Sequence, residues 1–291
     1  MGHLDHATFG WLTPLLSYAM ACIGAALGLS CTVRALDTTG RSRRNWLITA
    51  ASAIGSGIWT MHFVAMLGFG VYGTDIRYNV PLTFLSLLGA MVVVGGGVFA
   101  VGYSRDRTRA LLLGGFATGL GVASMHYLGM AALRLHGTIH YDPLRVVLSV
   151  VIAVIAATAA LWAALNIRST RAVALASLVM GAAVSSMHYT GMLAVTVQVK
   201  PSGTALPGAT AMQFIFPLAV GLGSYLFLTS AFVALSPTAP ERAAYAHAEH
   251  AQSPAGAPAA GAAVRGPDLR PRTAHGSGTP PVGSGAPVGT R

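Results

Sequence analysis

Seven long apolar runs alternate with short polar segments along most of the chain. Each run has about 20 residues, which is enough for a helix to cross roughly 30 Å of hydrocarbon. Two runs begin at recognisable breaks, Asn79-Val80-Pro81 and Asp142-Pro143. We therefore predict transmembrane helices at 9–33, 46–69, 80–103, 110–133, 144–166, 172–196 and 212–235.

The loops between these runs differ in charge. The even-numbered loops hold Arg77, Arg134 and Lys200, with Arg145 just inside the fifth run. The odd-numbered loops hold nine arginines: Arg34, Arg41, Arg43, Arg44, Arg105, Arg107, Arg109, Arg168 and Arg171. Positive charge gathers on the cytoplasmic side of membrane proteins, so we expect the N-terminus outside and the C-terminus in the cytoplasm. This regular spacing explains the net charge of +10 better than a nucleic-acid partner does, and none is expected.

Composition supports a membrane protein. The chain is 54% hydrophobic and 9% charged, whereas soluble domains carry about 25% charged residues. The first apolar run is too long for a signal peptide and has no basic segment before it, so we expect it to be retained. Cys22 and Cys31 lie about 13 Å apart along one helix, too far to form a disulfide.

The last part of the chain has a different composition. Residues 236–291 are rich in Pro, Gly, Ala and Ser and have almost no large apolar side chains. Such a segment cannot bury enough surface to offset the entropy lost on ordering. We expect a membrane domain over 1–235 and a disordered cytoplasmic tail over 236–291, with no output domain in that tail.

One motif occurs three times. The strings GSGIWTMHFVAML from Gly55, GLGVASMHYLGMA from Gly119 and GAAVSSMHYTGML from Gly181 align without gaps. Their histidines, His62, His126 and His188, are 64 and 62 residues apart, so each repeat is about two spans long. Repeats with an even number of spans keep their orientation in the membrane. The expected fold is an all-α membrane protein of seven transmembrane helices, with three parallel two-helix repeats and a seventh helix.

Counting residues places the three histidines at one depth. Each lies 17 or 18 residues after an arginine of the cytoplasmic side, namely Arg44, Arg109 or Arg171. At 1.5 Å per residue this is about 25 Å. We therefore predict one histidine layer in the outer half of the membrane.

The motif combines imidazole with thioether sulfur. A methionine precedes each histidine, and a second follows four residues later on the same helix face: Met61, Met66, Met125, Met130, Met187 and Met192. This donor set suits copper, because thioether favours Cu(I) and imidazole binds both oxidation states. Zinc, calcium or magnesium sites would normally include carboxylate or thiolate, and none of the eight acidic residues lies inside a predicted span.

Other interpretations of these residues remain open. A histidine in a helix is often a hydrogen-bonded packing residue, and duplication of a structural helix pair would repeat it without any ligand. The glycines of the motif can serve close helix packing alone. His136 and His140, four residues apart in an outer loop, are more typical of a solvated loop than of a metal-delivery site.

The strings Met61-His62-Phe63, Met125-His126-Tyr127 and Met187-His188-Tyr189-Thr190 resemble the MHYT domain of bacterial membrane sensors. The resemblance covers about residues 9–235. It implies a copper site near the outer membrane face, formed by Met and His of the motif, and a response to oxygen, carbon monoxide or nitric oxide. Only the third copy has all four letters, because the first has Phe63 and Val64 and the second has Leu128 in place of the Thr. Family members are often fused to output domains, so here we expect an unknown cytoplasmic partner.

Three classes of function follow. The first is a copper-dependent sensor in the bacterial plasma membrane that responds to a diatomic gas or to copper itself. The second is a transporter of copper or another metal, and the third a haem or copper electron carrier. We expect no enzymatic activity, because no acidic residue lies near a motif histidine. A retinal protein is excluded, because Lys200, in the last outer loop, is the sole lysine.

Overall fold

The computed structural model describes residues 4–5, 10–200, 202–236, 244 and 247–248. The chain divides into two compact units, Met1–Ala244 and Tyr245–Arg291. The first unit contains the helices and strands given below. Apart from Ser236, Ala244, His247 and Ala248, the predicted disordered tail lies outside the described residues.

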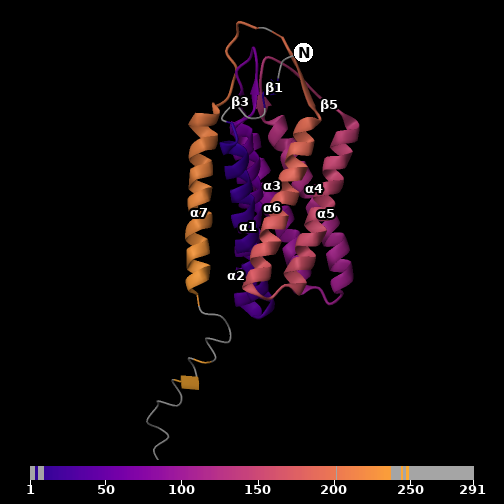
Figure 1. The fold of residues 1–291 in the computed structure, drawn as a ribbon, viewed down its shortest axis with the longest axis vertical. Coiled ribbons are helices and arrows are strands. Elements are labelled where there is room, and N and C mark those ends of the chain that lie inside the picture. The colour runs from indigo at the N-terminus through magenta and orange to yellow at the C-terminus, as the bar shows by residue number, and fades with distance from the viewer. Residues whose placement is uncertain (1–3, 6–9, 201, 237–243, 245–246, 249–291) are drawn as a thin grey trace, which may run out of the picture. The chain divides into compact units, whose positions relative to one another are not determined.

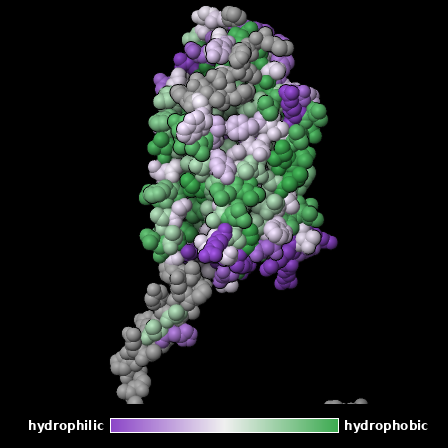
Figure 2. Space-filling model, viewed as in Figure 1, coloured by the Kyte–Doolittle hydropathy of each residue, from purple (hydrophilic) through white to green (hydrophobic). Residues whose placement is uncertain are grey.

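Seven helices of the described chain are long and apolar enough to span a membrane. The last, α7, begins with a π-helical turn, η1 (Ala211–Ile215). Their bounds are α1 Leu12–Leu36, α2 Gly40–Leu67, α3 Val80–Tyr103, α4 Arg107–Ala131, α5 Pro143–Asn166, α6 Thr170–Leu193 and α7 Phe216–Leu235. Figure 2 shows an apolar band around the molecule with hydrophilic side chains gathered at its ends.

All seven predicted spans are present, and the main errors concern their ends. α2 begins at Gly40 rather than at residue 46, so Arg41, Arg43 and Arg44 lie in its first turns. Long arginine side chains can reach the headgroup region from such a turn, so the helix need not stop where the apolar run stops. α6 ends at Leu193 rather than at residue 196, because the chain continues as a β-strand.

Helices α1 to α6 form a closed ring. Each packs mainly against its neighbours in the chain, and α6 packs against α1 to close the ring. The motif helices α2, α4 and α6 therefore alternate with the outer helices α1, α3 and α5. Close approach of the motif helices at the centre brings the three copies of the motif together.

The outer helices share a buried face that repeats along with the motif. Its pattern is a serine, an alanine, an alanine or valine, and a leucine or valine, each four positions after the last. The members are Ser17, Ala21, Ala25 and Leu29 on α1; Ser86, Ala90, Val94 and Val98 on α3; and Ser149, Ala153, Ala157 and Leu161 on α5. The three serines also donate to the carbonyl three residues back, at 2.7–2.8 Å. α1, α3 and α5 are therefore equivalent, and the predicted two-helix repeats are α1–α2, α3–α4 and α5–α6.

α7 lies outside the ring, against α1 and α2 (Figure 1). Its buried residues, Ala219, Leu226 and Val233, form one stripe at seven-residue spacing. Two polar contacts add to this packing. Tyr225 shares a 2.6 Å hydrogen bond with Ser52 of α2, and Arg34 of α1 donates to the carbonyl oxygens of Val233 and Ser236 at 2.7 and 3.1 Å.

Short strands join the repeats at the outer end of the helices (Figure 1), and we did not predict them from the sequence. The pairs are antiparallel: β1 (Leu4–Asp5) with β2 (Gly70–Val71), β3 (Arg77–Tyr78) with β4 (Leu133–Arg134), and β5 (Gly137–Tyr141) with β6 (Val195–Val199). The segment that follows each motif helix thus pairs with a neighbouring segment. Two to five residues per strand are too few for alternation to stand out beside the apolar runs.

Candidate metal centre

The three motif histidines lie in one layer, as predicted. Each is five residues before the last residue of its helix, which is Leu67 in α2, Ala131 in α4 and Leu193 in α6. Because the three helices end at corresponding points, the layer lies about 7.5 Å below their outer ends. All three side chains are buried, with at most 1% of their surface exposed.

The three imidazoles contact one another directly. Nδ1 of His62 lies 3.0 Å from Nδ1 of His188 and 3.1 Å from Nδ1 of His126. The ring centroids are 4.9, 5.0 and 5.2 Å apart, and the rings meet edge to face. Within the described residues, this triad is the one group of three or more His, Cys, Asp or Glu side chains close enough to hold a metal ion.

The short contacts between Nδ1 atoms limit which ring nitrogens of the triad can carry a proton. A neutral imidazole carries one N–H, so each contact needs a proton on one of its two nitrogens. His62 either donates to both neighbours or accepts from both. A metal ion requires the lone pairs, so binding through these atoms would replace the shared protons.

Glycines provide the space for the outer nitrogens of two rings. A Cβ atom at Gly129 would lie 2.5 Å from Nε2 of His62, and one at Gly191 would lie 2.5 Å from Nε2 of His126. Both Nε2 atoms are buried without a hydrogen-bond partner among the described residues. Each glycine is three residues after the histidine of its own helix, and the first copy has Ala65 at that position.

Aromatic rings surround the triad. Phe63, Tyr127 and Tyr189 each follow a histidine and contact its ring edge to face at centroid distances of 4.6–5.0 Å. The Tyr127 hydroxyl hydrogen-bonds to that of Ser149 on α5 at 2.6 Å, whereas the buried Tyr189 hydroxyl has no partner among the described residues. In the first copy Trp59 makes the corresponding hydrogen bond to an outer helix, donating from Nε1 to Ser86 Oγ at 3.0 Å.

A tyrosine of the outer strands covers the site from above. Tyr78 of β3 is 1% exposed, and its ring lies 6.1 Å from that of Phe63. Burial raises the pKa of Tyr78, so its phenol stays protonated at neutral pH. The strand region therefore adds no negative charge above the histidines at this point.

The six motif methionines are all at most 2% exposed. Met66, Met130 and Met192 are one turn beyond the histidines on the same helix face, towards the outer end. Met61, Met125 and Met187 are adjacent to the histidines and point about 100° away around the helix. The structure thus brings the three predicted histidines together and buries the six predicted methionines beside them.

The remaining predicted features lie outside this centre. His136 precedes β5 and His140 lies within it, so both belong to the outer strand region, and the triad does not include them. Cys22 and Cys31 are free thiols, which confirms the absence of a disulfide between them.

The first glycine of each motif brings the helices close together. A Cβ atom at Gly55 would lie 2.8 Å from Cα of Met91 on α3, and one at Gly119 would lie 2.4 Å from Cα of Val154 on α5. At Gly181 it would lie 2.5 Å from Sγ of Cys22 on α1. Each motif helix therefore approaches the next outer helix at its glycine, and close packing is part of the motif's role.

The sequence analysis missed the residues of the outer helices that hold the motif helices in place. Ser86 and Ser149 bind the motif helices through Trp59 and Tyr127. The signal that could have revealed them is the four-residue pattern shared by α1, α3 and α5. It is weaker than the histidine motif because small and apolar residues are common in every span.

Fold and site together define a multi-pass membrane protein of the bacterial plasma membrane, with a buried histidine triad near its outer face. The chain belongs to the MHYT family, whose model, described as a bacterial signalling protein N-terminal repeat, matches residues 55–115, 119–177 and 181–238. Each matched segment begins at the first glycine of one motif copy.

Curated relatives of the chain are signalling proteins. It is 44% identical over 186 residues to the bifunctional diguanylate cyclase/cyclic di-GMP phosphodiesterase MucR of Pseudomonas aeruginosa, an alignment that covers 61% of this chain and 27% of MucR. It is 36% identical over 209 residues to the cyclic di-GMP phosphodiesterase NbdA of the same organism (70% of this chain, 26% of NbdA). It is 32% identical over 208 residues to the signaling protein YkoW of Bacillus subtilis (66% and 24%). The chain therefore spans about a quarter of the length of these relatives, and no solved structure matches it.

Proposed function

We propose that this membrane signalling protein is a sensor that binds copper through His62, His126 and His188. The observation that carries the proposal is the convergence of three imidazoles from three helices in one buried layer. Ionisable side chains inside a membrane are costly and usually functional. One candidate ligand atom from each of the three histidines lies within 4.8 Å of the others, which is close enough for a single ion to contact all three.

The donor set fits copper better than other common metals. Imidazole binds both copper oxidation states, and the thioethers of Met66, Met130 and Met192 would favour Cu(I). Among the described residues no carboxylate or thiolate joins the triad, although zinc, calcium and magnesium sites normally include one. The adjacent methionines, Met61, Met125 and Met187, complete the proposed set of ligands.

The proposed signal is a diatomic gas or copper itself. When bound, copper would supply affinity for oxygen, carbon monoxide or nitric oxide that imidazole lacks. The protein's own residues bury the site, exclude water with Phe63, Tyr127 and Tyr189, and hold the three rings in register. A change in the spacing of the rings would shift α2, α4 and α6 between two packings. A cytoplasmic partner at the arginine-rich ends of these helices would receive that shift.

The structure gives the alternative functions less support. A transporter needs ligands across the whole depth of the membrane, whereas the described His, Cys, Asp and Glu side chains offer one cluster, near the outer end of the helices. A haem between the histidines would need space for a macrocycle, whereas their ring centroids are at most 5.2 Å apart.

Metal analysis of the purified protein tests this proposal. We expect copper to co-purify with the protein or to load stoichiometrically, and the triple variant His62→Ala/His126→Ala/His188→Ala to lose it. The matched control is His136→Ala/His140→Ala/His247→Ala, which removes three histidines outside the layer. Circular dichroism and size-exclusion chromatography would establish that both variants fold. Copper retention by a folded triad variant would overturn the proposal.

A further inference from the structure

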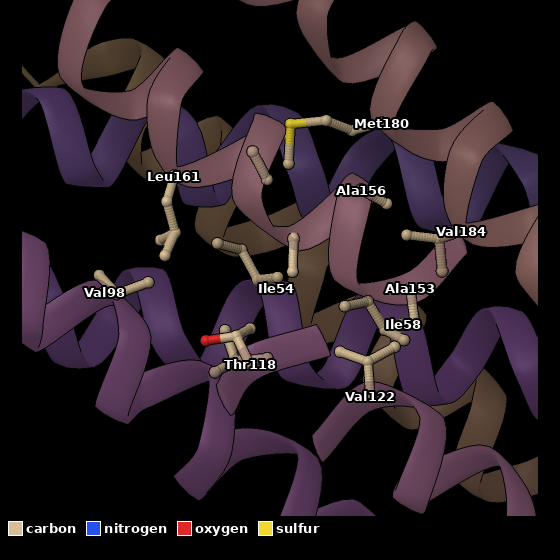
Figure 3. A pocket seen from close by; sticks show the side chains of 13 residues that line it. Ile54, Ile58, Val98, Thr118, Val122, Ala153, Ala156, Leu161, Met180 and Val184 are labelled. Carbon is tan, nitrogen blue, oxygen red and sulfur yellow. The ribbon is translucent and has the colours of Figure 1, made fainter. Parts of the chain in front are cut away.

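An apolar cavity lies on the cytoplasmic side of the histidine triad, and Figure 3 shows the side chains that line it. Ile58, Val122 and Val184 line it, and each is four residues before a motif histidine. Ile54, Thr118 and Met180, which also line it, are eight residues before those histidines. The cavity therefore begins about 6 Å below the imidazoles and continues towards the cytoplasm to about 12 Å.

Small residues on α5 create this space. The repeated face of the outer helices has Val94 on α3 but Ala157 at the equivalent position on α5, and both line the cavity. Ala153, Ala156 and Ala160 of α5 extend the same wall. These four alanines have short side chains and leave a volume that the motif helices do not fill.

The volume and the apolar lining of the cavity determine which molecules it can hold. Its volume is about 50 Å³, several times the about 10–15 Å³ that one water molecule needs. A buried water also needs two to four polar partners, and Thr118 is the one polar residue of the lining. Apolar cavities of this kind stay dry and bind small apolar molecules, and a charged or hydrogen-bonding ligand would lose its solvation without replacement.

Most of the partly exposed lining residues are on α5 and α6, with Ile54 of α2 in addition. Ile58, Val94 and Val122 on the other helices are buried, whereas Ala156, Ala160, Met180 and Val184 are partly exposed. Neighbouring residues on the same two helices, such as Ile155 (64% exposed) and Val179 (62%), face the lipid. Small apolar molecules dissolve in the bilayer and would reach the cavity between these helices.

We propose that this cavity is a binding site for a small uncharged apolar molecule taken up from the bilayer. It would hold such a molecule one helical turn below the histidine triad. A role in delivering a gas to the triad rests on the proposed function, whereas binding in the cavity itself requires no metal.

Xenon is the probe for this site. We expect ¹²⁹Xe NMR of the metal-free protein in nanodiscs to show a saturable shift above the background of empty nanodiscs. Ala157→Leu would fill the cavity and abolish that shift. Ala159→Leu makes the same change on the lipid-exposed side of α5 and should leave the shift unchanged.

Absence of a saturable shift in the unaltered protein would overturn the proposal, as would an equal shift in folded Ala157→Leu. If Ala157→Leu does not fold, Ala156→Val, which adds two methyl groups to the partly exposed wall, should reduce the shift instead. Copper analysis of the same samples separates the two proposals, because xenon binding without copper binding would overturn only the proposed copper site.

Discussion

Gly129 and Gly191 each occupy a position three residues after a motif histidine, and the imidazole of the preceding repeat lies against them. Nε2 of His62 and of His126 would each be 2.5 Å from a Cβ atom at these positions. The spacing of the triad therefore depends on the absence of two methyl groups as much as on the presence of three histidines.

Gly129→Ala and Gly191→Ala should each displace an imidazole and destabilise the fold. We expect a loss of about 1–3 kcal/mol, which is typical of overpacking in a close-packed interior. Thermal unfolding in detergent, followed by circular dichroism, measures it. Gly96→Ala on α3 is the control, because a Cβ atom there has no neighbour within 4 Å. Equal melting temperatures for all three variants would show that the rings have room to move.

At this scale the sequence predicted that three histidines lie in one layer, but not the contacts that they make. The triplicated motif named His62, His126 and His188 because identical spacing from the cytoplasmic arginines sets their depth. Spacing along the chain cannot give the direction in which a side chain points around its helix axis relative to other helices. The link between Tyr127 and Ser149 therefore required the structure.

The helices differ in where they pack, and their order along the chain does not show which of them form the ring. α1 supplies the same serine–alanine face as α3 and α5, and it lies between α6 and α2 in the ring. α7, which follows the last motif helix, packs outside that ring. The seven spans were predictable from hydropathy, because lipid requires long apolar helices, whereas the orientation that arginine position indicates stays a prediction. Packing between small residues determines which outer helix closes the ring. Hydropathy does not contain this information.

Arg34 is expected to hold the cytoplasmic end of α7 in place. Its guanidinium donates to the carbonyl oxygens of Val233 and Ser236 and lies 5.3 Å from the ring of Trp46. Arg34→Met keeps the aliphatic stem but removes these donors, so we expect amide hydrogen exchange at the end of α7 to quicken by about tenfold, equivalent to about 1.4 kcal/mol.

Arg44→Met is the matched control for this change, because it removes the same charge from an exposed position at the same end of the bundle. Unchanged exchange in Arg34→Met, or equal acceleration in both variants, would show that the arginine does not secure α7.

At the scale of the whole molecule, the distribution of arginines predicts a single orientation in the membrane. The nine arginines of the first, third and fifth loops and their flanking turns lie at one end of the helices, and the strands lie at the other. Thiol labelling of intact bacteria tests this in a Cys22→Ser/Cys31→Ser background. A membrane-impermeant maleimide should label Ser202→Cys in intact cells, and Ser104→Cys only after permeabilisation. The reverse pattern would invert the topology.

The two ends of the bundle are connected differently. Helix pairs are joined at the cytoplasmic end by three-residue loops at 37–39, 104–106 and 167–169, whereas paired strands tie the segments at the outer end. If each motif helix pivots where those strands fasten it, the histidine lies about 7.5 Å from the pivot and the far end at least about 36 Å away. Such a lever would multiply a movement at the imidazoles by about five, so a displacement of a few tenths of an ångström at the ligands would exceed one ångström at the cytoplasmic surface.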